Sequence, residues 1–374
     1  MTGKNPEDFM STISFCIIVR DEEEVLERCL GSIRPLADEI IVVDTGSMDR
    51  TMEIAARYTD RLFFFPWRDD FSAARNFAFS QAVMDFCMWM DADDVILPEQ
   101  AERFLQMKEE IPPDTDMIML PYEAAADKNG NASFVYYRER IVKNRAGFLF
   151  QGRVHEAIPL SGIILYRDIP IRHCRPGSRP RSDRNLNIYR AMEAAGEPFC
   201  PRDLYYYGRE LSAHGFYEQA IQILRKFLDC PDGWKENQID ACRQIAACCE
   251  QKGQDRQALS WLFRSFIYDL PRGETCCDIG KHFMDRTHYD LAAYWFEQAL
   301  RAPKRILSGA FVLEDCYGFY PAICLCICYD KMGDPETAEA YNELAGSYQP
   351  QSPYYLQNKQ YFSSRKQTES RNTS

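Results

Sequence analysis

The sequence predicts a protein of two parts, an α/β domain with a mostly parallel sheet followed by an all-helical domain of repeats. In the first half, short apolar runs alternate with amphipathic stretches, which is the pattern of strand-helix-strand units. In the second half, helical segments recur at a period near 34 residues. A length of 374 residues suits about two domains. We place the α/β domain at 1–180, a connecting helix or linker at 181–200, the repeats at 201–350 and a polar C-terminal tail at 351–374.

Four apolar runs in the first half of the α/β domain predict buried strands. They lie at 13–19, 40–43, 62–65 and 86–90. Between them, a helix is expected over 22–33, where apolar residues fall at helical spacing: Val25, Leu26, Cys29, Leu30 and Ile33. Two more helices are expected at 49–58, which Asp49 can cap, and at 71–83.

From residue 117 to about 171 the pattern becomes rich in β-structure. Strands are predicted within it at 134–142 and 163–166, with turns at 128–130 and 161–162. A turn-rich break at 175–180 follows, and then a helix at 182–195. We expect the β-rich region to complete a site that the earlier strands begin.

The repeats are recognised from four small residues that each follow a turn residue by five positions. Ala220, Ala258, Ala292 and Ala338 lie 38, 34 and 46 residues apart, after Gly215, Gly253, Thr287 and Gly333. A period near 34 with helix-turn-helix character is typical of tetratricopeptide repeats, and the longer last interval allows an insertion at about 304–318. Aromatic residues in these segments are expected to be core. The concave face of such a stack is a candidate partner surface, and a homodimer through the repeats is one possible arrangement.

Charge and composition argue against some classes of binding partner. The net charge of −12 argues against a nucleic-acid surface or a general anionic-membrane surface. No apolar stretch approaches the roughly 20 residues of a transmembrane helix, and we expect a cytoplasmic protein. The fifteen cysteines include no Cys-x-x-Cys pair, so we expect them to be reduced, with Cys324, Cys326 and Cys328 as buried apolar residues. In a cytoplasmic protein the glycosylation sequon at 131–133 has no meaning.

Three polar clusters stand where predicted strands end. They are Arg20-Asp21-Glu22, Asp44-Thr45-Gly46-Ser47 and Asp91-Ala92-Asp93. Ligands of open α/β sheets collect at the carboxyl ends of strands, so these clusters should line one site. In the turn after the fourth strand, Asp91 and Asp93 can converge on one hard cation, and that cation could bind a diphosphate. A solvated acidic turn is the alternative for this pair taken alone.

Four ordered motifs carry a resemblance to a known family. They are 14–23, 40–51, 69–76 and 89–94, the last reading Trp89-Met90-Asp91-Ala92-Asp93-Asp94. Together they resemble the family 2 glycosyltransferases of GT-A fold, a Rossmann-like fold. The chain is similar to members fused to tetratricopeptide repeats, including the S-glycosyltransferases that modify bacteriocin peptides. Asp21 departs from the family's more common asparagine and lacks its amide donor.

The resemblance implies transfer of a sugar, usually with inversion, from a nucleotide diphosphate donor, which we expect to be a UDP-hexose or UDP-N-acetylhexosamine. It implies that Asp93 binds Mn²⁺ or Mg²⁺ directly, that Asp91 reaches the ribose and the metal shell, and that Asp44 lies near the nucleoside. Arg75 matches an arginine that faces the nucleotide pocket. The expected donor-binding set is Arg20, Glu22, Asp44, Thr45, Arg75, Asp91, Ala92, Arg140 and Arg153.

Later residues resemble the acceptor side of the same subgroup. Glu156 is the expected base, because an inverting transfer needs a carboxylate that removes the acceptor proton. His155 could orient Glu156, and His173 could complete the metal shell or touch the diphosphate. Arg140 and Arg153 could neutralise phosphate oxygens. For each histidine, a purely structural role is the alternative.

Several functions remain open from the sequence. The acceptor could be a cysteine, serine or threonine side chain of a peptide or protein, or it could be a saccharide of the cell envelope. The chain could also be an inactive scaffold that binds a partner through its repeats, although its metal-binding carboxylates are retained. A nucleotidyltransferase would be expected to carry a glycine-rich loop after the first strand, and 20–23 offers none.

Overall fold

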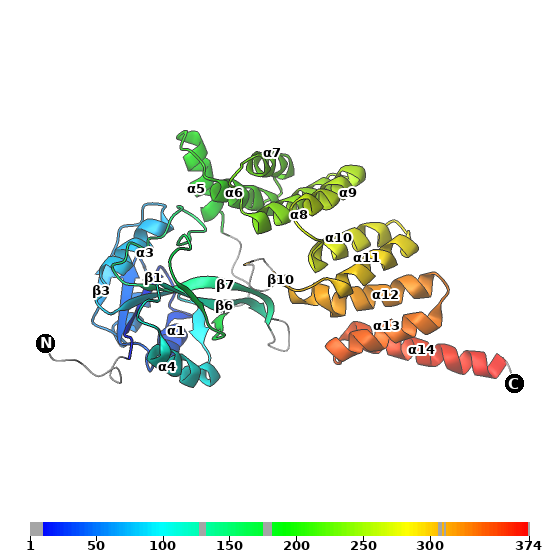
Figure 1. Cartoon of the computed structure of the whole chain (residues 1–374), viewed down its shortest axis with the longest axis horizontal. Helices are drawn as coiled ribbons and strands as arrows, with labels where there is room; N and C mark the ends of the chain where they lie inside the picture. The colour runs from blue at the N-terminus through cyan, green and yellow to red at the C-terminus, as the bar shows by residue number, and fades with distance from the viewer. Residues whose placement is uncertain (1–9, 127–131, 175–181, 306–308, 310–311, 373–374) are drawn as a thin grey trace. The chain divides into compact units, whose positions relative to one another are not determined.

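The structure is a computed structural model that describes residues 10–126, 132–174, 182–305, 309 and 312–372. The chain divides into two compact units, Met1–Asp203 and Leu204–Ser374 (Figure 1). Of the helices described, none is long and apolar enough to cross a membrane. The predicted turn at 128–130, the sequon residue Asn131 and the break at 175–180 lie outside the described residues.

The first unit is built on one sheet whose strand order is β3-β2-β1-β4-β7-β6-β9-β5, with β8 paired to β6. The first four strands of the sequence run parallel, as predicted. They are β1 (Ile13–Val19), β2 (Glu39–Asp44), β3 (Leu62–Phe64) and β4 (Phe86–Met90). Their carboxyl ends therefore meet at one edge of the sheet.

The second part of the sheet is mixed. It contains β5 (Asp94–Ile96), β6 (Met117–Ala126), β7 (Ala132–Lys143), β8 (Ile164–Tyr166) and β9 (Ile171–His173). Strand β7 runs antiparallel to both β4 and β6, and β9 pairs antiparallel with β5. The β-rich region predicted from the sequence thus extends the parallel half and brings β9 beside the segment that follows β4.

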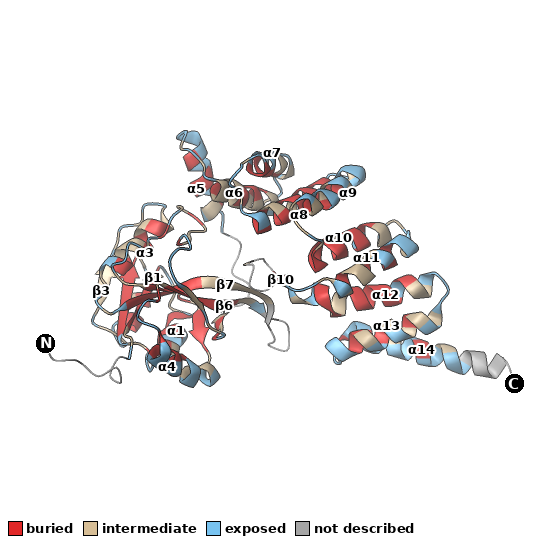
Figure 2. Cartoon of the chain, viewed as in Figure 1, coloured by how far each residue is buried: buried red, intermediate tan, exposed pale blue. Residues whose placement is uncertain are grey.

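Helices cover both faces of the sheet, so the parallel strands β1, β2 and β4 are almost entirely buried (Figure 2). One face packs against α1 (Leu26–Ile33) and α4 (Ala101–Glu110), which follows the 3₁₀ turn η2 (Pro98–Gln100). The other face packs against α3 (Phe71–Ser80). Helix α2 (Thr51–Ala55) joins the first of these clusters, and α5 (Arg184–Ala194) follows the described part of the sheet.

The predicted helix at 22–33 begins four residues later than expected. The backbone N–H of Glu22 donates to Thr51 Oγ1 at 2.8 Å, and that of Glu23 donates to Asp49 Oδ2 at 3.0 Å. These amides are therefore satisfied by side chains that follow the second polar cluster and not by a helical turn. Helix α2 is also shorter than predicted, with Asp49 Oδ1 accepting from the N–H of Thr51 at 2.9 Å.

The second unit is a stack of helical pairs. Its helices are α6 (Pro201–Ala213, which crosses the unit boundary), α7 (Tyr217–Leu228), α8 (Lys235–Gln251), α9 (Asp255–Arg264), α10 (Gly273–Met284), α11 (Tyr289–Arg301), α12 (Phe319–Lys331), α13 (Pro335–Tyr348) and α14 (Pro353–Asn372). Short elements join them: η3 (Ser265–Ile267), β10 (Val312–Leu313) and η5 (Glu314–Tyr317). All of α14 lies within the predicted polar tail at 351–374.

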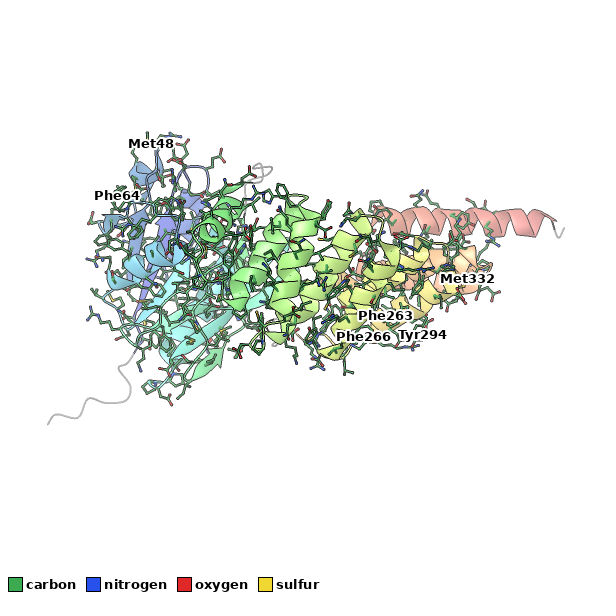
Figure 3. The ribbon with its side chains drawn as sticks, turned by 90° about the horizontal axis from the view of Figure 1, so that it is seen from above. Met48, Phe64, Phe263, Phe266, Tyr294 and Met332 are labelled. Atoms are coloured by element: carbon green, nitrogen blue, oxygen red, sulfur yellow. The ribbon has the colours of Figure 1, made fainter. Side chains whose placement is uncertain are left out.

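The four alanines that defined the repeats are all fully buried, at 0% exposure. The turn residues before them have positive φ, including +61° at Thr287, so each helical pair reverses through a left-handed residue. Phe263, Phe266 and Tyr294 lie near one another on this unit (Figure 3), with ring centroids 5.4–6.0 Å from that of Trp295. The fifteen cysteines are free, and Cys324, Cys326 and Cys328 are buried in α12.

Candidate active site

The first two polar clusters meet at the ends of β1 and β2. The N–H of Asp21 donates to Ser47 Oγ at 3.0 Å, and Asp21 Oδ1 accepts from the N–H of Met48 at 2.7 Å. Asp21 has φ +53°, a left-handed conformation that aspartate tolerates better than most residues. The carboxylate that replaces the family's asparagine thus links the two loops, and Met48 beside it is 93% exposed (Figure 3).

Asp44 and Thr45 lie at the end of β2 and are buried. Asp44 Oδ1 accepts from the N–H of Ser47 at 3.0 Å, and Thr45 Oγ1 donates to the carbonyl of Val19 at 3.0 Å. A carboxylate has about four acceptor positions, so Asp44 keeps capacity for a ligand. Arg20, at the end of β1, is half-exposed and lies 3.9 Å from the carboxylate of Asp21.

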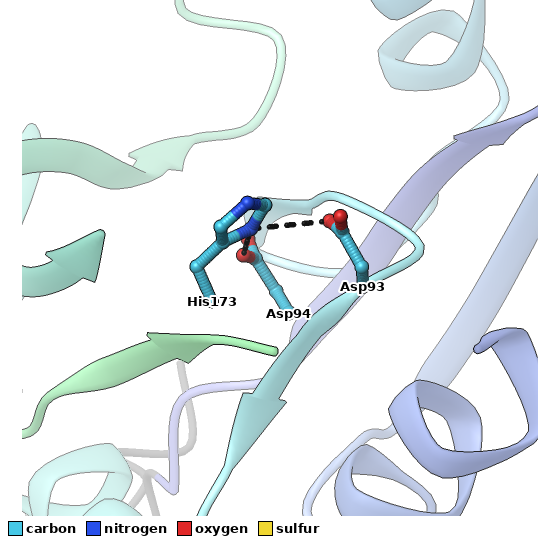
Figure 4. Close-up of side chains that lie close together, drawn as sticks. All are labelled: Asp93, Asp94 and His173. Carbon is cyan, nitrogen blue, oxygen red and sulfur yellow. Dashed lines mark ion pairs between the residues drawn. The ribbon is translucent and has the colours of Figure 1, made fainter. Parts of the chain in front are cut away.

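After β4, three side chains form a compact group. One possible ligand atom from each of Asp93, Asp94 and His173 lies within 4.8 Å of the others (Figure 4). His173 Nδ1 is 3.3 Å from Asp93 Oδ1 and 3.6 Å from Asp94 Oδ1. The antiparallel register of β5 and β9 places Asp94 opposite His173, which is how residues 79 positions apart in the sequence come together.

The chemistry of this group fits a divalent cation. Asp94 Oδ1 and His173 Nδ1 are buried polar atoms without a hydrogen-bond partner among the described residues. Burial acts to lower the pKa of His173, but the carboxylates of Asp93 and Asp94 outweigh it and raise the pKa to about 9. Carboxylate oxygens suit Mg²⁺ and Mn²⁺, and an imidazole nitrogen is a further ligand for a transition metal.

Beside this group, Arg75 on α3 joins two carboxylates. Its Nη2 donates to Asp91 Oδ1 at 2.5 Å and its Nε donates to Glu156 Oε1 at 2.6 Å. Burial acts to raise the pKa of Asp91, but the charges of Arg75 and Arg140 lower it to about 2. Burial likewise acts to lower the pKa of Arg75, and the charges of Asp91 and Glu156 raise it above its ordinary value. Arg75 and Asp91 are therefore both ionised at neutral pH.

Asp91 is separate from the candidate metal group. Its carboxylate turns toward Arg75, and its side chain is 35% exposed. Asp94, to which the sequence assigned no role, joins Asp93 and His173 instead. The sequence signals for Asp94 are its place directly after Asp93 and its inclusion in the motif at 89–94.

The indole ring of Trp89, at the end of β4, is surrounded by guanidinium groups. The central carbons of Arg75 and Arg138 each lie 4.7 Å from the ring centroid, and that of Arg140 lies 3.8 Å away. Stacking of arginine on an aromatic face is favourable, and it fixes the guanidinium plane. Trp89 was not among the predicted site residues.

Arg140, predicted as a phosphate ligand, has a fully buried side chain between the rings of Trp89 and Tyr122. Its Nη1 pairs with Asp94 Oδ2 at 2.9 Å. Because no part of Arg140 reaches the surface, it can contact a phosphate only if the surrounding side chains move. In this arrangement its direct partner is Asp94.

Three of the remaining predicted residues, Arg153, His155 and Glu156, belong to one loop. Glu156 is largely buried, and Arg153 pairs with Glu197 at 2.8 Å. His155 has φ +52°, and its carbonyl accepts from Arg202 Nε at 2.8 Å. Ala92 is buried between the two aspartates.

The chain is similar to a known protein family and to several curated proteins. Residues 14–155 match the model described as glycosyl transferase family 2. A TPR repeat-containing protein of Synechococcus elongatus is 36% identical over 303 residues, which cover 79% of this chain and 67% of that protein. The SPbeta prophage-derived glycosyltransferase SunS of Bacillus subtilis is 26% identical over 233 residues, 58% of this chain and 53% of SunS. The lipopolysaccharide core biosynthesis glycosyltransferase LpsC of Rhizobium meliloti is 34% identical over 107 residues, 26% of this chain and 39% of LpsC.

Proposed function

Because the chain belongs to the family 2 glycosyltransferases and carries tetratricopeptide repeats, we propose that it transfers a hexose or N-acetylhexosamine from a UDP-sugar to a peptide or protein side chain, with inversion. One observation carries the proposal: the Asp93, Asp94 and His173 group lies at the carboxyl end of β4, next to the Arg75 bridge. A cation site beside a carboxylate base is what an inverting, metal-dependent transfer requires.

The donor would bind across the ends of β1, β2 and β4. Asp93, Asp94 and His173 would hold Mn²⁺ or Mg²⁺, which would offset the charge of the diphosphate as the bond to the sugar breaks. Asp44 would accept hydrogen bonds from the base or the ribose. Asp91 would accept from the ribose with the part of its carboxylate that Arg75 leaves exposed.

Glu156 would act as the base on the acceptor. Arg75 Nε holds Oε1 of Glu156, so the carboxylate has one defined orientation before the acceptor arrives. In an in-line displacement, the acceptor oxygen or sulfur bonds to the anomeric carbon while the bond to the diphosphate oxygen breaks, and the acceptor proton passes to Glu156. A cysteine acceptor would need less help, because a thiol ionises near pH 8.5.

Nucleotide release tests the proposal. The protein is incubated with Mn²⁺ and UDP-, GDP- and dTDP-sugars, and we expect slow hydrolysis of a UDP-hexose that is lost in Asp93→Ala. The matched control is Asp60→Ala, an exposed aspartate outside the site, which should keep full release. Undiminished release by Asp93→Ala, or no release by the wild type with any donor, would contradict the assignment.

A further inference from the structure

Arg184, the first residue of α5, stacks on an aromatic ring and has no carboxylate partner in the part of the chain that the structure describes. Its guanidinium carbon lies 4.6 Å from the centroid of the Phe71 ring. Among the described residues, none forms an ion pair with the Arg184 guanidinium. The side chain is exposed, so a ligand can reach it. A charged group that is oriented by stacking but not neutralised is available to an anion.

The Phe71 ring, on which Arg184 stacks, is connected to residues of the candidate active site. Phe71 begins α3, one helical turn before Arg75, which pairs with Glu156. The N–H of Phe71 donates to the carbonyl of Arg153 at 2.9 Å, so the start of α3 is tied to the loop that contains Glu156. The stacked guanidinium is therefore fixed relative to both Arg75 and Glu156.

Helix α5 is held against the same loop at a second point. The ring of Tyr189 is fully buried, and its hydroxyl lies 3.5 Å from the carbonyl of Val154, two residues before Glu156. Arg184 thus contacts the start of α3, and Tyr189 contacts the loop after Gly152. These two segments are themselves joined by the hydrogen bond from Phe71 to Arg153. This double attachment distinguishes Arg184 from an arginine on a freely exposed helix.

The charges near Arg184 are those of the donor site. Neighbouring chain segments partly desolvate the exposed Arg184 guanidinium and lower its pKa, Glu156 and Glu22 act to raise the pKa, and Arg20 acts to lower it further. The charges that act on Arg184 thus come from the end of β1 and from the proposed base. Arg75 Nη1, which is buried and has no hydrogen-bond partner among the described residues, is a second guanidinium donor on α3.

We propose that Arg184 binds a phosphate of the nucleotide diphosphate donor, so that a residue outside the predicted 1–180 domain contributes to the donor site. The inference rests on the proposed function. A diphosphate carries more negative charge than one divalent cation offsets, and arginine forms strong charge-assisted hydrogen bonds with phosphate oxygens.

Binding measurements separate this role from a structural one. With Mn²⁺ present, calorimetry would give the affinities of UDP, GDP and dTDP and of the corresponding nucleosides. For the diphosphate that the wild type binds, we expect Arg184→Gln to weaken binding about tenfold, or roughly 1.4 kcal/mol, with nucleoside affinity unchanged. Arg184→Lys should retain part of the affinity, because lysine keeps the charge but not the planar fork.

The matched control is Arg190→Gln, which removes the same charge from an exposed position of α5 and should leave diphosphate affinity unchanged. An equal loss in both variants would mean a general effect of net charge and would overturn the role of Arg184. So would an Arg184→Gln variant that melts earlier but binds the diphosphate normally. If the wild type binds none of the three diphosphates, the proposed function fails and this inference with it.

Discussion

Arg140 and Asp94 form an ion pair in which both side chains are completely buried, with Nη1 and Oδ2 2.9 Å apart. Oδ2 of Asp94 also accepts the N–H of Asp91 at 3.1 Å. The other oxygen of Asp94, Oδ1, lies 3.6 Å from Nδ1 of His173. Arg140 thus sets which oxygen of Asp94 is available to a cation, and its part in the site is to position a ligand.

Removing Arg140 should destabilise the first unit strongly. Arg140→Met leaves the Asp94 carboxylate buried without its partner, which typically costs about 3–5 kcal/mol of unfolding free energy. Urea denaturation measures the loss. The control is Arg103→Gln, which breaks an exposed pair with Asp168 and should cost less than about 1 kcal/mol. Equal, small losses in the two variants would contradict the stabilising role of the buried Arg140–Asp94 pair.

Metal binding should depend on pH through His173. In the metal-free protein its pKa is about 9, above the ordinary value of 6.5, so the ring is protonated at neutral pH. A cation needs the neutral ring, and apparent Mn²⁺ affinity should therefore rise as pH increases toward 9 and then level off. Calorimetry at pH 7 in buffers of different ionisation enthalpy should detect close to one proton released per Mn²⁺. His173→Gln should abolish that release, and a release that persists would exclude His173 as its source.

The same shift predicts how the stability of the metal-free protein changes with pH. A raised pKa means that protonation of His173 stabilises the fold fully below about pH 6.5, and this contribution is lost as pH rises through about 9. Denaturant titrations with chelator present should show the decline in wild type. In His173→Gln the corresponding part of the decline should be missing.

Glu156→Gln should separate binding from transfer. The amide keeps the size of the side chain but cannot accept the acceptor proton, so transfer should fall by about 10²–10⁴-fold while UDP affinity stays within a few-fold of wild type. Single-turnover assays with a hydroxyl acceptor measure the first quantity and calorimetry the second. Unchanged transfer to a hydroxyl would remove Glu156 as the base.

Close packing between helices of the second unit should make Gly280→Ala destabilising. A Cβ at Gly280 would lie 2.8 Å from the ring of Phe296, which is fully buried. Overpacking costs about 1–3 kcal/mol, more than the roughly 1 kcal/mol that alanine gains over glycine in a helix. Gly31→Ala in α1 is the control, because its Cβ would meet only Tyr58 Oη at 3.8 Å and should be neutral or stabilising. Thermal denaturation compares the two.

The strands were predictable from sequence because each buried strand is a short apolar run with a polar end, and β4 has the predicted bounds of 86–90. The repeats were predictable because the small alanines must pack between helices at a fixed period. The start of α1 was not predictable, since it depends on the side chains of Thr51 and Asp49, which accept hydrogen bonds from the backbone N–H groups of Glu22 and Glu23. Such contacts between clusters leave no periodic signal in the sequence.

For the candidate site, the resemblance supplied Asp93 and His173, which the structure brings together. Asp94 was missed because its place depends on the register of β5 with β9 and on its burial against Arg140. Burial also explains why the predicted phosphate role of Arg140 does not match its surroundings. An arginine between two aromatic rings cannot be distinguished from an exposed one by sequence spacing alone.

The three guanidinium groups around Trp89 give the protein an intrinsic optical probe. Indole emission responds to nearby charge, and a donor that draws Arg75 or Arg138 away from the ring would change it. The chain has four other tryptophans, Trp67, Trp234, Trp261 and Trp295, which can be replaced by phenylalanine. Fluorescence of such a single-tryptophan variant would follow occupancy of the site in real time, without a labelled sugar and before any acceptor has been identified.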